Sequence, residues 1–304
     1  MSLKDEVLAA LAAGGLSPLH RFGQNFMIDG GALQTLVQEL ALTNSASVVE
    51  VGPGTGVLTQ RLLDAGARVT AVEIDRGLHQ VIATRFAAEL GGRLALVHGD
   101  CLETKNILHP AIVAVAAAGP WRLGANLPYD VALPVVLNAA ALPRPPELVV
   151  VTVQWEAAER LCSRPGEDAW GASAATLQAA GRPRLLRKLP PQCFYPRPRV
   201  DSALLRWEPT AALPADFGRW CRALFSSRRK VVVRALRDHG VERDQAEAAC
   251  GACGIVTDRR LESLDAPELL ALHRALAVIA PTASAVSAMS PSEPSQSKEL
   301  NNEQ

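Results

Sequence analysis

Short apolar runs alternate with amphipathic stretches along the first half of the chain. The runs that predict buried strands cover residues 47–51, 68–74, 93–99, 121–125 and 147–153. The stretches that predict helices cover residues 32–42, 56–65, 77–90, 103–118, 131–141 and 155–162. Strands that alternate with helices in this way predict parallel βαβ units, so we expect an α/β protein with a doubly wound sheet. Ligands of such sheets bind at the carboxyl ends of the strands.

The pattern changes beyond residue 162. A helix is predicted at 171–180, and two strand candidates, 184–189 and 202–207, flank the segment PPQCFYPRPRVD. We expect these two strands to pair antiparallel at one edge of the sheet. After a linker at 208–213, short helices are predicted at 216–225, 227–238, 242–251 and 266–278, which would form a small all-helical domain.

The chain is therefore expected to have three parts, an α/β domain over residues 1–208, a helical domain over 209–280 and a tail over 281–304. The first part opens with a predicted helix at 4–13 and a long loop. The tail is rich in serine and proline and has almost nothing to bury, so we expect it to be disordered.

The composition is that of a globular protein. Hydrophobic residues make up 48% of the 304 residues and aromatic residues only 4%, so alanine, valine and leucine must form the core. No apolar run approaches the roughly 20 residues that a bilayer-spanning helix needs. The N-terminus carries acidic residues where a signal peptide has basic ones. We therefore expect a cytoplasmic protein without a membrane partner.

The cysteines point to no metal or redox centre. Six of them are scattered through a chain that is too large to need disulfide bonds, which predicts reduced thiols. Cys250 and Cys253 form a C-x-x-C pair, but no second pair or histidine cluster accompanies them. We expect them to be small residues that pack a helical turn, and we expect no metal.

The charge becomes informative once it is divided along the chain. The 31 basic and 31 acidic residues cancel overall, but the stretch 182–237 holds fourteen basic and three acidic residues, a net charge of +11. The remainder carries −11. Within this basic block, R-P-R-L-L-R-K (182–188) and S-S-R-R-K (226–230) contain no acid. The block therefore favours a polyanionic partner such as nucleic acid over an ordinary solvated surface.

The segment E-V-G-P-G-T-G (50–56) lies where a predicted strand ends and a helix begins. Glycines at such a turn let the backbone approach a nucleotide, and amide groups of the helix start face it. A dinucleotide fingerprint has G-x-G-x-x-G, whereas here the third glycine comes one residue earlier. Glu73 and Asp100 end the next two strands, where they can meet ribose hydroxyls and adenine. Together these features predict a cofactor cleft.

The segment N-L-P-Y (126–129) follows another predicted strand, so it borders the same cleft. An exocyclic adenine amine is a poor nucleophile, because its lone pair is delocalised into the ring. Two acceptors, the Asn126 side-chain oxygen and the Leu127 carbonyl, can hold its hydrogens and direct the nitrogen at an electrophilic methyl. Pro128 presets the direction of that carbonyl by restricting Leu127 to extended conformations. Tyr129 offers a ring on which the base can stack.

A second rigid aromatic segment, F-Y-P-R-P-R-V-D-S-A, covers residues 194–203. Phe194 could cover the other face of a base that stacks on Tyr129. Extrusion of a base costs a few kcal/mol, and stacking between two rings would offset that cost. The alternative is that Phe194 belongs to the core, although the neighbouring prolines disfavour a strand interior there.

The motifs resemble, in this order, those of the small-subunit ribosomal RNA adenine dimethyltransferases, a family of class I S-adenosylmethionine-dependent methyltransferases. The matching segments are RFGQNFMID (21–29), EVGPGTGVLT (50–59), VEID (72–75), HGD (98–100), NLPY (126–129), PPQCFYPRPRVDSALLR (190–206) and LFSSRRKVVVRAL (224–236). They span most of residues 18–275. The combination of RFGQNF, NLPY and F-x-P-x-P-x-V-D-S-A is highly specific, whereas a glycine turn alone is not.

The resemblance implies a Rossmann-like fold and the transfer of two methyl groups to the 6-amino group of each of two adjacent adenosines. These adenosines lie near the 3′ end of small-subunit ribosomal RNA, and the reaction belongs to ribosome assembly. The implied cofactor is S-adenosyl-L-methionine, bound by the domain over 1–208 and covered by residues 1–30. The implied partner is a pre-assembled small ribosomal subunit, docked by the helical domain over 209–280. We expect a monomer.

The resemblance also assigns residues. Those expected at the reacting base are Asn126, Leu127, Pro128, Tyr129 and Phe194. Those expected at the cofactor are Asn25, Met27, Gly52, Gly54, Glu73, Ile74, Asp100, Cys101 and Asn126. Those expected at RNA are Arg197, Arg199, Arg222, Arg228, Arg229 and Lys230. The chain departs from the family's usual pattern at Asp130 and Trp155, where asparagine and lysine are common, and at Trp170.

Other hypotheses stay open. A large-subunit ribosomal RNA adenine methyltransferase would share the cleft, although the complete 194–203 segment favours the small subunit. An assembly factor that binds ribosomal RNA with little catalysis is a second alternative, against which the intact residues Gly52, Glu73, Asn126 and Tyr129 argue. A dinucleotide oxidoreductase is disfavoured by the early third glycine.

Overall fold

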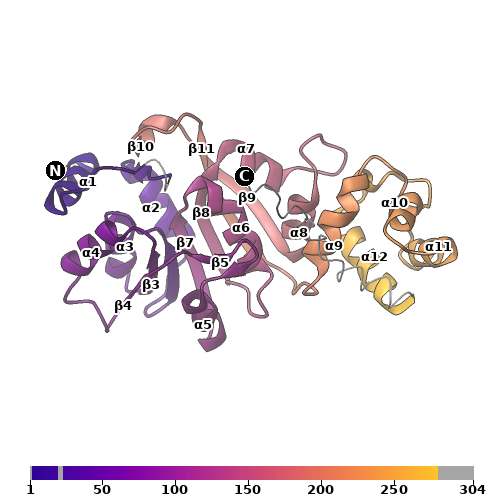
Figure 1. Ribbon diagram of the computed structural model, residues 1–304, viewed down its shortest axis with the longest axis horizontal. Helices are drawn as coiled ribbons and strands as arrows, with labels where there is room; N and C mark the ends of the chain where they lie inside the picture. Colours follow the sequence, from indigo (N-terminus) through magenta and orange to yellow (C-terminus); the bar gives the residue numbers. More distant parts are fainter. Residues whose placement is uncertain (1, 20–22, 280–304) are drawn as a thin grey trace, which may run out of the picture.

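The computed structural model describes residues 2–19 and 23–279. Its central sheet has seven strands in the order β4-β3-β2-β7-β8-β11-β9 (Figure 1). The strands are β2 (Ser47–Val51), β3 (Arg68–Glu73), β4 (Leu94–His98), β7 (Trp121–Asn126), β8 (Leu148–Gln154), β9 (Gly181–Leu189) and β11 (Ser202–Pro209). The first five in the sheet order are parallel, while β11 runs antiparallel to both β8 and β9. The expected doubly wound sheet with an antiparallel edge is confirmed.

Helices cover both faces of this sheet. On one face lie α1 (Leu3–Ala13), α2 (Gly30–Glu39), α3 (Val57–Asp64) and α4 (Arg76–Arg85), and on the other lie α5 (Pro110–Ala118), α6 (Tyr129–Ala140), α7 (Trp155–Cys162) and α8 (Ala172–Ala180). Neighbouring residues of one strand enter different cores, since side chains alternate between faces. Val150 packs with the first group and Val151 with the second. Burial on both faces explains why the strands are almost continuously apolar.

The stretch 103–118 was expected to be mostly helical, and this prediction is wrong for its first part. Residues 102–108 form a small hairpin of β5 (Leu102–Thr104) and β6 (Ile107–Leu108). The helix α5 begins only at Pro110, where His109 caps it by accepting the amide hydrogen of Ala111 (3.1 Å). Proline is favoured at the first helical position and not inside a helix, so Pro110 sets the boundary.

The C-terminal helices build a third hydrophobic core. It comprises residues of α8, α9 (Phe217–Leu224), α10 (Val232–Asp238), α11 (Arg243–Ala252) and α12 (Ala266–Ile279). They occupy one end of the molecule (Figure 1). Trp170 and three alanines of α8, namely Ala174, Ala175 and Ala179, belong to this core although they precede residue 209. The division between domains at 208 and 209 stays a prediction, and the tail over 281–304 lies outside the described residues.

One predicted helix in this region starts later than expected. The prediction was 227–238, but α10 begins at Val232. A 3₁₀ turn covers Phe225–Ser227, and the Val232 amide donates to the Arg259 carbonyl instead of continuing a helix from residue 227. The prediction for 77–90 is likewise too long, because α4 ends at Arg85.

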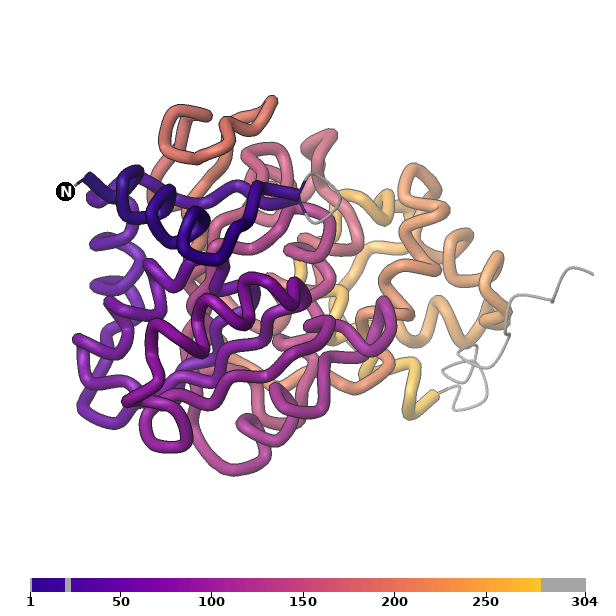
Figure 2. The backbone as a smooth tube through the Cα atoms, turned by 60° about the vertical axis from the view of Figure 1, so that its left-hand side comes forward, coloured from indigo at the N-terminus to yellow at the C-terminus, as the bar shows by residue number. Residues whose placement is uncertain are grey.

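The sequence did not predict the small sheet that joins the two aromatic segments. Strand β1 (Phe26–Met27) pairs antiparallel with β10 (Phe194–Tyr195), so Met27 lies opposite Phe194. Figure 2 shows the N-terminal segment and the loop near residue 195 side by side. The pairing holds residues 23–29 near the carboxyl ends of the parallel strands. Within the described ranges, no helix has the length and apolar character needed to cross a bilayer.

Candidate active site

A pocket of about 330 Å³ opens at the carboxyl ends of β2, β3, β4 and β7. This volume falls within the range of roughly 300–1,000 Å³ that is typical of small-molecule sites. The residues predicted from sequence for the cofactor or the base all line it, namely Asn25, Met27, Gly52, Gly54, Glu73, Ile74, Asp100, Cys101, Asn126, Leu127, Pro128, Tyr129 and Phe194. The fold thus brings together segments that lie up to 169 positions apart in the chain.

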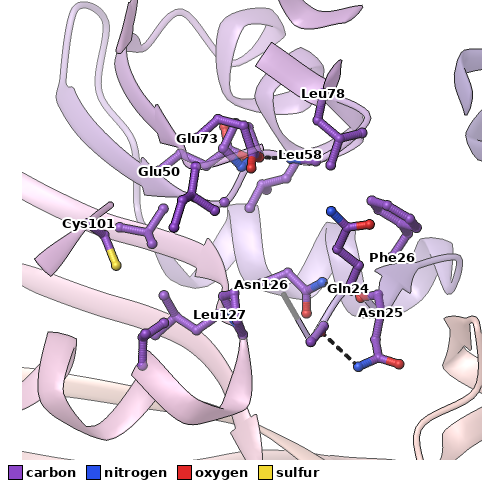
Figure 3. Close-up of a pocket in the computed structure, with 18 of the residues that line it drawn as sticks. Gln24, Asn25, Phe26, Glu50, Leu58, Glu73, Leu78, Cys101, Asn126 and Leu127 are labelled. Carbon is purple, nitrogen blue, oxygen red and sulfur yellow. Dashed lines mark hydrogen bonds between the residues drawn. The ribbon is translucent and has the colours of Figure 1, made fainter. Parts of the chain in front are cut away.

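Polar groups concentrate at two places around this pocket. Figure 3 shows the side chains of Glu50 and Glu73 grouped on one side, and those of Gln24, Asn25 and Asn126 grouped on another. The rest of the lining is largely apolar. Such a pocket can hold a ligand that is apolar over much of its surface and carries hydroxyl or amino groups at defined positions.

The glycine turn has a backbone that only glycine adopts readily. Gly52, Gly54 and Gly56 have φ values of 64°, 61° and 81°, in the left-handed region. A Cβ on Gly54 would lie 2.9 Å from the Phe26 ring, so the turn also lets the N-terminal segment pack closely. Helix α3 begins directly after Gly56. The amides of these glycines donate within the protein, to the Val72 carbonyl, the Glu73 carboxyl and the Pro53 carbonyl, so the turn lines the pocket with backbone that carries no side chains at the glycines.

Glu73 is the buried acid beside this turn. Its side chain is 3% exposed, and its two carboxylate oxygens accept hydrogen bonds from the amides of Gly54 (3.0 Å) and Asp75 (2.9 Å). Burial raises the pKa of the carboxyl above its usual value, and the backbone donors counteract this rise. Each oxygen keeps a second lone pair, so Glu73 can still accept a hydrogen bond from a ligand hydroxyl.

Glu50 is a second buried acid, which the sequence marked only as part of the turn motif. It is 1% exposed, and the Thr59 hydroxyl donates to its carboxyl (2.7 Å). Burial, assisted by the nearby Glu73 charge, raises the pKa of Glu50 to about 8. Glu50 is therefore mostly protonated at neutral pH.

The ends of β3 and β4 supply an apolar surface and an exposed acid. Ile74 lines the pocket although 41% of its surface is exposed, so its apolar face is available to a ligand. Asp100 is exposed, and one of its oxygens accepts the amide hydrogen of Leu102 (2.9 Å). Burial raises the pKa of the Cys101 thiol to about 12, so this thiol stays protonated and is no nucleophile.

Asn126 ends β7, and its amide is held from two sides. Its nitrogen donates to the backbone carbonyl of Asn25 (2.8 Å), and its oxygen accepts from the Thr152 hydroxyl of β8 (2.5 Å). Leu127 is buried, and Pro128 caps α6 with its carbonyl, which accepts from Ala132 (3.0 Å). The turn is thus anchored at both ends.

The ring of Tyr129 is half-buried at the start of α6. Its hydroxyl lies 2.6 Å from the hydroxyl of Ser202, which is fully buried at the start of β11. Burial raises the pKa of the phenol, so Tyr129 stays neutral at physiological pH. One end of the ring is thereby tied to the sheet while the ring lines the pocket.

Phe194 lines the pocket but is only 2% exposed, and it packs in the same core as Phe26 and Met27. Phe194 therefore belongs to the hydrophobic core, as the alternative hypothesis from the sequence stated, although it also lines the pocket. A contact between Phe194 and a base stays a prediction.

Sequence reasoning missed four residues that shape the site, Gln24, Asp75, Thr152 and Ser202. Gln24 accepts from the Leu19 amide (2.7 Å) and donates to Asp75 (3.0 Å), which ties the N-terminal segment to the end of β3. Thr152 had a signal in the sequence, because it is a polar residue inside an otherwise apolar strand. The partners of Gln24 and Ser202 depend on tertiary contacts that no local pattern reveals.

The residues predicted to bind RNA lie outside the pocket. Arg197 and Arg199 are exposed on the loop after β10, and Arg222 and Arg229 are exposed on the helical region. Two members of the set have partners within the fold. Arg228 donates to the carbonyls of Asp168 (2.9 Å) and Trp170 (3.1 Å), and Lys230 pairs with Asp238 (2.6 Å).

Comparison with known proteins agrees with this geometry. The family model for ribosomal RNA adenine dimethylase matches residues 18–277. The chain belongs to the ribosomal RNA adenine dimethylase family. The match includes residues 18–30 of the N-terminal segment, the glycine turn, N-L-P-Y and most of the C-terminal helices, so the predicted family membership is confirmed.

Relatives within the ribosomal RNA adenine dimethylase family are similar over most of their length. A protein of Synechococcus sp. (strain JA-3-3Ab), named ribosomal RNA small subunit methyltransferase A, is 38% identical over 283 residues, which cover 89% of this chain and 97% of the relative. A protein of the same name from Leifsonia xyli subsp. xyli (strain CTCB07) is 37% identical and covers 85% and 92%, respectively.

Two solved structures share the fold of this family member. A dimethyladenosine transferase from Plasmodium falciparum matches with a TM-score of 0.68 and 19% identity, covering 84% of this chain and 98% of its own. The 23S rRNA methyltransferase ErmE matches with a TM-score of 0.60 and 22% identity, covering 83% and 99%. At these identities the similarity establishes the class I methyltransferase fold.

We predict that Gly54→Ala destabilises the protein more than Gly91→Ala. Both glycines have left-handed backbones, with φ values of 61° and 73°, but a Cβ on Gly91 meets nothing within 4 Å. The left-handed strain should cost about 1–2 kcal/mol at either site. At Gly54 the overlap with Phe26 adds to it. Urea unfolding of the two variants measures the difference, and equal losses would contradict the packing of Phe26 on the turn.

We further predict a pH-dependent effect of Glu50→Gln. Between pH 4.5 and about 8, folded Glu50 binds a proton that the unfolded chain has lost. The contribution of Glu50 to the unfolding free energy of the wild type is therefore fully present below that window and is lost as the pH rises through it. The glutamine variant cannot titrate at this position. The difference in unfolding free energy, variant minus wild type, should therefore rise across this window by on the order of a few kcal/mol. Urea unfolding over a pH series tests this, and a pH-independent difference would contradict a protonated Glu50.

Proposed function

We propose that this chain uses S-adenosyl-L-methionine to dimethylate the 6-amino groups of two adjacent adenosines near the 3′ end of small-subunit ribosomal RNA. The observation that carries the proposal is the arrangement of N-L-P-Y. The Asn126 amide and the Tyr129 ring border the same pocket as the glycine turn and Glu73, and a Cβ on Gly52 would lie 3.6 Å from the Pro128 ring. Relatives at 37–38% identity are named for the small subunit.

The residues that line the pocket match the chemical groups of this cofactor. Glu73 would accept from the ribose hydroxyls, the exposed face of Ile74 would contact the adenine, and Asp100 would meet its amino group. The glycines of the turn carry no side chains into the pocket, so they would leave room for the methionine part. When bound, the cofactor supplies an electrophilic methyl group on a sulfonium centre. The chain's residues then have to orient the acceptor amine and exclude water.

Asn126 and Leu127 would orient that amine. The Asn126 oxygen has two lone pairs, and the Thr152 hydroxyl occupies one, so one remains for an N–H of adenine. Pro128 has no N–H that could compete for the base, and it holds the Leu127 carbonyl in an extended conformation. Preorganised acceptors of this kind act on the transition state, because positive charge develops on the nitrogen as it attacks.

Tyr129 would hold the base by stacking. A base on an aromatic ring gains about 1–3 kcal/mol, whatever its sequence context. The hydrogen bond to Ser202 restrains the ring, so less freedom is lost when a base binds. The N-terminal segment, tied to Asp75 and to β10, would close the pocket on the side of Asn25.

The basic block supports RNA as the polymer that carries the adenosines. Residues 182–237 carry a net charge of +11, whereas the rest of the chain carries −11. Four arginines of this block are exposed, namely Arg197, Arg199, Arg222 and Arg229. We propose that the helical region docks on the pre-assembled small subunit in the cytoplasm and that the chain acts as a monomer. The similarity to ErmE, at 22% identity, argues for the shared fold and not for a large-subunit substrate.

The direct test is methyl transfer from labelled S-adenosylmethionine to small subunits that lack the modification. We expect dimethyladenosine in digests of their RNA, and loss of nearly all labelling in Asn126→Ala, whose acceptor oxygen is missing. Labelling of free large-subunit RNA instead would support the large-subunit alternative. An Asn126→Ala variant that restores subunit assembly without methylation would make binding the main role.

We predict that Arg229→Glu weakens binding to small-subunit RNA and makes it less salt-dependent. Arg228 is engaged with the Asp168 and Trp170 carbonyls, so Arg229 is the better probe of phosphate contact. Each lost contact should reduce the slope of log K against log salt by about 0.7–0.9. Arg61→Glu, an exposed site on α3 outside the basic block, is the control for net charge. An unchanged slope for Arg229→Glu would exclude a phosphate contact there.

A further inference from the structure

Strand β8 contains a hydroxyl where its neighbours are apolar. Thr152 is 0% exposed and lies between Val151 and Val153, which are equally buried. A buried hydroxyl costs free energy unless it forms a hydrogen bond, and a valine of the same shape would fill the space without that cost. The identity of its hydrogen-bond partner should therefore explain why a threonine, and not a valine, is buried at this position.

That partner is the amide of Asn126. The Thr152 hydroxyl donates to the Asn126 oxygen over 2.5 Å, across the parallel pair of β7 and β8 in which Asn126 lies opposite Thr152. The contact is short for a hydroxyl donor, within the usual range for such bonds. Because the two residues are paired directly in the sheet, the register of β7 and β8 fixes this hydrogen bond, and no loop conformation is needed to form it.

A second contact decides which way the amide points. The Asn25 carbonyl can only accept, so the Asn126 nitrogen must face it (2.8 Å) and the oxygen must face Thr152. A flipped amide would set two acceptors against each other at Asn25. The two partners come from opposite sides, one from the N-terminal segment and one from the sheet.

We propose that Thr152 is a positioning residue for methyl transfer, which rests on the function proposed above. Its hydroxyl holds the Asn126 oxygen in one direction and leaves one lone pair of that oxygen for the adenine amine. Thr152 does not contact cofactor or base itself, since it is fully buried and absent from the pocket lining. The Thr152 hydroxyl increases the fraction of time that the Asn126 amide has the orientation needed for reaction.

The kinetic test compares Thr152→Val with Thr152→Ser in single-turnover methylation of small subunits. We expect the valine variant to lose about five- to tenfold in rate, the size of one net hydrogen bond, and the serine variant to stay near wild type. KM for S-adenosylmethionine and for subunits should not change, because Thr152 touches neither. A wild-type rate in the valine variant, or an equal loss in the serine variant, would overturn the proposal.

A matched control separates this effect from general damage to the core. Thr176 is also buried, and its hydroxyl donates to the Ala172 carbonyl within α8, away from the pocket. Thr176→Val makes the same chemical change and should leave the methylation rate at the wild-type value. A loss equal to that of Thr152→Val would show that removal of any buried hydroxyl slows the reaction, and would overturn the specific role of Thr152.

A substrate-free measurement tests the orientation itself. In nuclear magnetic resonance spectra of the full chain labelled at asparagine, the two Asn126 amide protons should be distinct in wild type and in Thr152→Ser. In Thr152→Val they should shift or merge as the amide gains freedom. Unchanged Asn126 signals in the valine variant would overturn the inference. A wild-type chain that labels no adenosine would contradict only the proposed function, because these spectra would still decide the role of Thr152.

Discussion

The site depends above all on the amide of Asn126 and the two groups that hold it. The Asn25 carbonyl belongs to the N-terminal segment and the Thr152 hydroxyl to strand β8, so one side chain connects the N-terminal segment to the central sheet. An amide has a donor end and an acceptor end, and only one orientation satisfies both partners. This constraint makes the direction of a single oxygen depend on the correct packing of segments that lie 101 and 26 positions away in the chain.

The acids beside the glycine turn form a second constraint, because backbone donors stabilise a buried carboxylate there. Glu73 is almost fully buried, and the amides of Gly54 and Asp75 stabilise its charged form. The Gly54 amide reaches it because the left-handed glycine backbone turns this N–H toward β3. At Glu50 burial outweighs the hydrogen bonds that Thr59 donates, and it raises the pKa of this carboxyl to about 8. Uptake of a proton by Glu50 therefore avoids two repelling charges beside the pocket.

The antiparallel edge of the sheet completes the pocket. Because β9 and β11 run antiparallel to each other, the loop between them returns to the end of the sheet where β8 finishes and α7 begins. That loop carries Phe194 and pairs through β10 with Phe26 and Met27, while the start of β11 brings Ser202 to the Tyr129 hydroxyl. A purely parallel sheet would have placed a helix there. The reversal of one strand, β11, thus supplies both the second aromatic segment and the restraint on the Tyr129 ring.

The sequence by itself determined the kind of fold and most of the pocket. Alternating apolar runs, the glycine turn and N-L-P-Y are local patterns, and parallel strands deliver their carboxyl ends to one edge whatever the details of packing. The hairpin at 102–108, the late start of α10 and the pairing of β1 with β10 were decided by tertiary structure, since each rests on a proline boundary or a partner far away in the chain. So were the roles of Gln24, Thr152 and Ser202. A hydrogen bond between distant side chains depends on strand register and on how segments fold over one another, and neither is encoded in the spacing of residues along a single element.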